Sequence, residues 1–144
     1  MTVPQVRTFF DDYVAAFTDR DIYRICMMWA YPAFMAFEGR QLTFDAPSFK
    51  ANVERLCHRY TERGMARAEK DVVDLVPLTA TTAAVTTNDR VYREDGTLLA
   101  TWKHAYLLNE SDSRISIIAA MPDDENRAWR EIDAQRPLGC DQPR

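Results

Sequence analysis

The segment from Gly96 to Leu108, GTLLATWKHAYLL, constrains the fold more than any other part of the chain. As a strand it would be long enough to cross a whole sheet. Because side chains alternate along a strand, one face would carry Leu98, Ala100, Trp102, His104, Tyr106 and Leu108. Lys103 lies on the opposite face, and lysine is rarely buried without a partner, so we assign that face to the outside. Trp102, His104 and Tyr106 then point inward, and polar-tipped aromatic rings in a row are typical of a small-molecule pocket.

The start of the chain predicts two helices. Thr2 and Gln5 have the spacing of a capping box, and apolar residues then recur at steps of three and four as far as Phe17. A second, shorter helix is expected after Asp19, the favoured N-cap. Its apolar face would include Trp29, and Pro32 would end it, because the residue before a proline avoids helical angles.

Two short strands and a third helix are expected next. The strands are predicted at 33–37 and 42–44, joined by a polar turn. Asp45 is placed to cap the third helix, whose apolar stripe falls at steps of three and four. Gly64 is placed to end it.

After Gly64 the apolar period changes from 3.6 to 2, which indicates strands. Strands are predicted at 65–76, 79–92, 96–108 and 114–121, and Asp95-Gly96 is a hairpin signal. Tight polar turns between these segments predict an antiparallel meander. A polar amphipathic helix is expected at 123–135, followed by a loose tail.

Composition excludes several classes of protein. The chain has 144 residues and a net charge of -4, with no basic run, which argues against nucleic-acid binding. No apolar run is long enough to span a membrane, and the N-terminus lacks signal-peptide features, so a cytoplasmic protein is expected. Cys26, Cys57 and Cys140 fit no metal motif, and a total of two histidines argues against a zinc site. We therefore expect neither a metal nor a cofactor.

These elements predict an α+β fold. Three N-terminal helices would pack in the concave face of a strongly curved, mixed but mainly antiparallel sheet, forming a cone with an internal pocket. We expect one domain at residues 1–122 and a polar C-terminal helix and tail at residues 123–144.

The order of the elements and several local strings resemble the nuclear transport factor 2-like superfamily. That superfamily includes SnoaL-like polyketide cyclases, ketosteroid isomerases and scytalone dehydratases. The strings are YVAAFTDRDIYRI from Tyr13, the small strand pair ending at Phe44, the helix from Asp45, and RVYREDGTLLATWKHAYLL from Arg90. The likeness covers about residues 5 to 121. It implies a fold, whereas the activities within such a superfamily differ widely.

The resemblance can be carried over residue by residue. Tyr13 matches the tyrosine that donates a hydrogen bond to the substrate oxygen in ketosteroid isomerases. Counting without gaps places Phe37 where those enzymes have their aspartate base, and Glu38 would point to the other face. No acid stands near His104 on its strand, where the second acid of the isomerase site would be expected. The paired histidines and aspartates of scytalone dehydratases are also missing.

Elimination leaves His104 as the candidate proton-transfer group, because a histidine titrates near neutral pH. Tyr13 or Tyr106 would polarise the substrate oxygen. The expected ligand-binding residues are Phe10, Trp29, Tyr31, Phe34 and Trp102.

Three hypotheses remain open on these residues. The chain is an isomerase- or lyase-type enzyme without metal or cofactor, a non-catalytic binder of a small, mostly apolar molecule, or a structural dimeric accessory protein. An apolar outer face containing Leu99, Ala105 and Leu107, with Ile115 or Ile118 beside them, predicts a homodimer.

Overall fold

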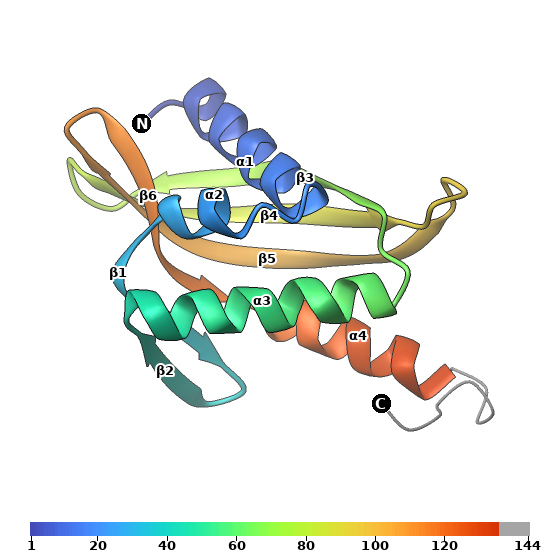
Figure 1. Ribbon diagram of the computed structural model, residues 1–144. Coiled ribbons are helices and arrows are strands. Elements are labelled where there is room, and N and C mark those ends of the chain that lie inside the picture. Colours follow the sequence, from blue (N-terminus) through green and yellow to red (C-terminus); the bar gives the residue numbers. More distant parts are fainter. Residues whose placement is uncertain (136–144) are drawn as a thin grey trace.

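A computed structural model describes residues 1–135, which form an α+β fold around one curved sheet (Figure 1). The elements, in chain order, are α1 (Val3–Thr18), α2 (Ile22–Met27), β1 (Trp29–Phe37), β2 (Arg40–Phe44), α3 (Ala46–Glu62), β3 (Arg67–Pro77), β4 (Thr82–Tyr92), β5 (Leu98–Ser111), β6 (Arg114–Met121) and α4 (Asp123–Gln135). The predicted tail and Cys140 lie outside the described residues.

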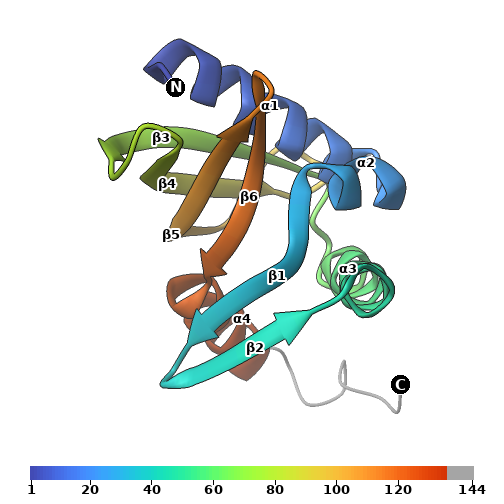
Figure 2. The same cartoon turned by 90° about the vertical axis from the view of Figure 1, so that its left-hand side faces the viewer.

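The six strands are ordered β2-β1-β6-β5-β4-β3. All neighbours are antiparallel except β1 and β6, which run parallel. Figure 2 shows how the sheet curves, with α1, α2 and α3 beside it and the β1–β2 hairpin extending away from the meander. The mixed sheet and the antiparallel meander confirm the predicted fold class.

Local sequence signals place most helix ends correctly. Thr2 and Gln5 form the predicted capping box of α1, and the side chain of Asp45 accepts a hydrogen bond from the Ser48 amide at the start of α3. These groups satisfy amides that have no partner inside the helix. No helix in residues 1–135 is both long and apolar enough to cross a membrane.

The second helix differs from its prediction. Asp21 caps it, whereas Asp19 ends α1. The helix stops at Met27, so Trp29 and Pro32 belong to β1. The pairing of β1 with β6 is irregular between Trp29 and Phe34, and this irregular stretch accommodates a residue without an amide hydrogen.

Alternation along β5 holds in its centre and fails at its start. Trp102, His104 and Tyr106 are buried and Lys103 is exposed, as expected. An irregularity in the pairing with β4 lies between Val91 and Tyr92. Consequently Leu98, which was expected to point inward, is 50% exposed, and Leu99 packs partly against the inner core.

The core consists of two apolar clusters under the sheet. The larger one joins α1, α2 and α3 to the inner face of the sheet through residues such as Phe10, Phe49 and Leu108. The smaller one brings Trp129 of α4 against Tyr60 and Trp102. The division of the chain at residue 122 stays a prediction, although α4 packs on the inner face through Trp129.

Candidate functional site

A cavity of about 560 Å³ lies between the inner face of the sheet, α3, α4 and the β1–β2 hairpin. Its apolar wall includes Leu42, Phe44 and Leu56. Its polar wall includes buried side chains from α1, α3, the long strands and α4, namely Tyr13, Tyr60, Lys70, Asp89, His104, Tyr106 and Glu125.

Asp89 is the most heavily hydrogen-bonded group of this wall. It lies on β4, where Val85, Thr87, Asp89 and Val91 alternate toward the interior. Its carboxylate pairs with the Lys70 ammonium and accepts hydrogen bonds from Trp102 Nε1 at 3.0 Å and Thr87 Oγ1 at 2.8 Å. A buried charge with this many partners is fixed in place.

Glu125 enters the cavity from the first turn of α4. Its Oε2 accepts hydrogen bonds from the Tyr60 hydroxyl and from Trp129 Nε1, the latter at 3.1 Å. Burial raises the pKa of Glu125 above its ordinary value, although these two hydrogen bonds oppose that shift. Its other oxygen, Oε1, lies 3.5 Å from His104 Nδ1.

His104 lies between these two acids and is 8% exposed. Its Nδ1 is 3.9 Å from Asp89 Oδ2. Within residues 1–135 neither ring nitrogen has a hydrogen-bond partner, because the contact with Glu125 does not have hydrogen-bond geometry. Burial and the nearby Lys70 charge lower the pKa of His104 well below 6.5, so the ring is neutral at pH 7.

Two tyrosines present hydroxyls to the same cavity. The Tyr106 ring stacks on His104 with centroids 4.3 Å apart, and its hydroxyl accepts a hydrogen bond from Lys70 Nζ at 2.8 Å. The Tyr13 hydroxyl accepts a hydrogen bond from Trp29 Nε1 at 3.0 Å. Burial raises the pKa of both phenols, so both remain protonated and able to donate.

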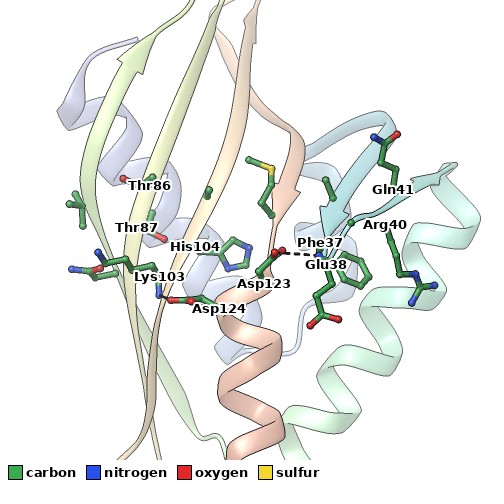
Figure 3. A pocket seen from close by; sticks show the side chains of 16 residues that line it. Phe37, Glu38, Arg40, Gln41, Thr86, Thr87, Lys103, His104, Asp123 and Asp124 are labelled. Carbon is green, nitrogen blue, oxygen red and sulfur yellow. Dashed lines mark hydrogen bonds between the residues drawn. The ribbon is translucent and has the colours of Figure 1, made fainter.

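A second hollow, of about 550 Å³, also borders His104 (Figure 3). It lies between the β1–β2 hairpin, the end of β6 and the middle of β4 and β5, and shares Phe37, Arg40 and His104 with the cavity. Asp123 accepts a hydrogen bond from the Glu38 amide, and Asp124 accepts one from the Lys103 amide. These contacts tie the start of α4 to the hairpin and to β5.

The structure brings together five of the sequence-predicted residues and leaves three apart. Tyr13, Trp29, Trp102, His104 and Tyr106 line the cavity. Phe10 is fully buried in the helix-facing core. Tyr31 and Phe34 lie outside the cavity wall and are 37% and 47% exposed. The Tyr31 ring packs edge-on against Phe49. Phe34 lies on the outer face of β1, because its neighbour Ala33 is the buried one.

The sequence interpretation missed the charged residues around His104. An acid was expected on the strand that carries His104, whereas Asp89 comes from β4 and Glu125 from α4. The period-2 burial of β4 is a signal that could have found Asp89. Among the described residues, no group of three or more His, Cys, Asp or Glu side chains is placed to hold a metal ion.

Solved structures with the same fold support this description. An "NTF-2 like protein of unknown function" from Shewanella oneidensis has a TM-score of 0.66 and 13% identity over 84% of this chain and 98% of its own. The protein Aln2 from a Streptomyces species has a TM-score of 0.69 and 14% identity, with 88% and 92% covered. A ketosteroid isomerase-like protein from Erwinia carotovora atroseptica has a TM-score of 0.58 and 14% identity, with 83% and 92% covered.

At these identities the solved structures establish the fold alone. A comparison with curated proteins found no match. A family profile described as "NTF2-like protein (DUF6841)" matches residues 4–125, which is most of the sequence. The chain therefore belongs to this NTF2-like protein family.

Proposed function

We propose that the protein binds a small, mostly apolar, carbonyl-bearing molecule in the cavity and catalyses a proton transfer, as in an isomerase, cyclase or dehydratase. The observation that carries this proposal is His104. A neutral imidazole with both ring nitrogens buried and unpaired in the described residues borders the cavity. An unpaired buried polar group costs stability, so a ligand that pairs with it would be favoured.

The surrounding groups fit a division of roles. His104 removes a proton next to the carbonyl, and the Tyr106 hydroxyl donates a hydrogen bond to the carbonyl oxygen. Lys70 would strengthen the hydrogen bond from Tyr106 to the carbonyl, because its ammonium donates to the Tyr106 hydroxyl and makes the phenol a stronger donor. Tyr13 is a second donor on the same wall.

Glu125 is the positioning residue in this mechanism. Its free oxygen faces Nδ1 of His104, and a short movement would make a hydrogen bond that fixes the ring. An imidazolium formed during the reaction would then lie between the carboxyl groups of Glu125 and Asp89, which would stabilise its charge.

A non-catalytic binder is the second candidate function. The observation that favours it is the internal pairing of the wall, because Asp89 and Lys70 satisfy each other without a ligand. In that case Tyr13 and Tyr106 would hold a ligand carbonyl and His104 would only accept a hydrogen bond. A measurement of proton transfer separates the two candidates.

The pH dependence of a model proton transfer tests the proposal. The probe is 5-nitrobenzisoxazole, a small apolar molecule whose N–O bond breaks when a base removes its C3 proton, releasing a coloured phenolate. We expect catalysis that rises with pH and reaches half its maximum below pH 6.5, because the lowered pKa keeps His104 neutral in mild acid.

The control reaction uses free imidazole at the same concentration as the protein. Free imidazole is half protonated at about pH 6.5 to 7. Four charged or titratable side chains face His104, namely Lys70, Asp89, Tyr106 and Glu125. The midpoint of the pH profile therefore belongs to this coupled group rather than to the His104 ring alone. A rate no faster than that with imidazole, at every pH, would support the binder instead.

We further propose that the protein forms a homodimer through the outer face of the sheet. One row of paired residues across β1, β6, β5 and β4 is apolar throughout and consists of Phe34, Ala119, Leu107 and Ala84. Phe34 is 47% exposed, and Val76 of β3, which pairs with Ala84, is 46% exposed. Such a continuous apolar stripe is typical of an interface. Leu99 and Ile115, which were also expected there, pack partly against the inner clusters instead.

Sedimentation equilibrium tests the dimer. We expect twice the chain mass of 16.6 kDa at tens of micromolar protein. Leu107→Lys places a charge in the centre of the stripe and should yield monomers, because an unpaired charge is costly in an apolar interface. Leu98→Lys is the matched control, since Leu98 is exposed at the end of β5. A wild-type monomer at these concentrations contradicts the proposal.

A further inference from the structure

The mouth of the cavity carries a positive charge that the described contacts leave unneutralised. Exposed lining residues mark this mouth, where the β1–β2 hairpin, α3 and α4 meet, and they include Arg40, Arg59 and Arg130. Arg130 pairs with Glu38, and Arg63 pairs with Asp133, so these two cations are neutralised.

Arg40 and Arg59 have no such partner, because neither forms a side-chain hydrogen bond or an ion pair with any residue in the described part of the chain. The guanidinium of Arg40 lies 5.6 Å from the centre of the Phe37 ring, which holds it at the rim. Figure 3 shows it directed toward α3, the helix that carries Arg59. Both residues line the same cavity.

The acids of the cavity are already engaged. Asp89 pairs with Lys70, and Glu69 pairs with Arg90 and with Arg67. Glu125 accepts hydrogen bonds from Tyr60 and Trp129. In a protein whose net charge is -4, two unpaired arginines at one mouth are therefore a local excess of positive charge.

We infer that the ligand of this cavity carries an anionic group, such as a carboxylate, that Arg40 and Arg59 bind at the mouth. This inference rests on the function proposed above and narrows the substrate class to an acid with an apolar, carbonyl-bearing body. The body lies against the apolar wall, its carbonyl meets Tyr106 and His104, and its charged end stays at the solvent side. Arginine suits this role because its planar fork matches a carboxylate.

A matched pair of probes tests the inference by isothermal titration calorimetry. The probes are 4-oxo-4-phenylbutanoate and its primary amide, which have almost the same size and differ by one charge. We expect the acid to bind about tenfold more tightly than the amide at low salt, and the gap to shrink in high salt. Arg40→Gln combined with Arg59→Gln should remove the gap and leave binding of the amide unchanged.

Arg55→Gln is the matched control, because Arg55 is exposed on α3 but is not part of the cavity wall. It should keep the wild-type gap. Equal affinities of the wild-type protein for the acid and the amide would overturn the inference. A difference in affinity that persists in the double variant would also overturn it. Either result would leave the proposed function standing. If neither probe binds, the proposed function fails and the inference with it.

Discussion

His104→Gln should slow the elimination of 5-nitrobenzisoxazole by about 10² to 10⁴-fold, the range typical of a positioned general base. Glutamine has a similar size and can accept a hydrogen bond, but it does not take up a proton near neutral pH. The reason for a large effect is the surroundings of the ring. His104 is buried, neutral and unpaired within residues 1–135, whereas the Asp89 carboxylate is already engaged by three donors.

The control for this variant is His58→Gln. The His58 side chain is 75% exposed on α3, contacts Glu62 and is not part of the cavity wall. It should leave the rate unchanged. Initial rates of phenolate release, with circular dichroism to confirm folding, measure both variants. Full activity in a folded His104→Gln protein would remove His104 from the mechanism and direct attention to Glu125.

Lys70 acts on two groups of the site at once. Its charge lowers the pKa of His104 and, through its hydrogen bond, polarises Tyr106. In the proposed mechanism, one buried cation thus tunes both the base and the hydrogen-bond donor. In that mechanism, a pH profile would show the effect on His104, and the maximal rate would reflect both effects.

The sequence predicted the fold well because its signals are local. The capping box at Thr2, the Asp45 cap and the stripe of α3 each depend on neighbours within a few residues. The centre of β5 was also predicted, because the burial of Trp102 and the exposure of Lys103 follow from strict alternation. The resemblance to the NTF2-like superfamily added the order of the layers.

The candidate site was less predictable because it depends on contacts between distant segments. Glu125 sits in the first turn of α4, where an acid is expected simply to interact favourably with the helix dipole. Only the docking of α4 on β5 turns its carboxylate toward His104. Asp89 similarly meets Lys70 through the register of β3 against β4, which alternation alone does not fix.

The β1 segment shows the opposite error, in which a local signal was misleading. The apolar spacing from Ile22 continues through Trp29, which favours a longer helix, but the chain leaves the helix after Met27. Pairing with β6 and the hydrogen bond from Trp29 to Tyr13 outweigh the helical preference.

Asp89→Ala should have the largest effect on stability. The side chains of Asp89 and Lys70 are each 7% exposed, and both charges are buried as a pair. Removing the carboxylate leaves Lys70, Trp102 Nε1 and Thr87 Oγ1 without that acceptor. Breaking a buried ion pair in this way typically lowers the free energy of unfolding by about 3 to 5 kcal/mol. Urea unfolding followed by tryptophan fluorescence measures the change.

The pairing itself is tested by adding Lys70→Met. Because methionine removes the stranded charge, the double variant should be more stable than the sum of the two single effects predicts. Asp74→Asn is the matched control, since Asp74 is exposed on β3, and it should change stability by less than about 0.5 kcal/mol. If Asp89→Ala does not fold, Asp89→Asn keeps the shape and the acceptor oxygen and still removes the charge. Simple additivity of the Asp89 and Lys70 substitutions would show that the two charges do not stabilise each other.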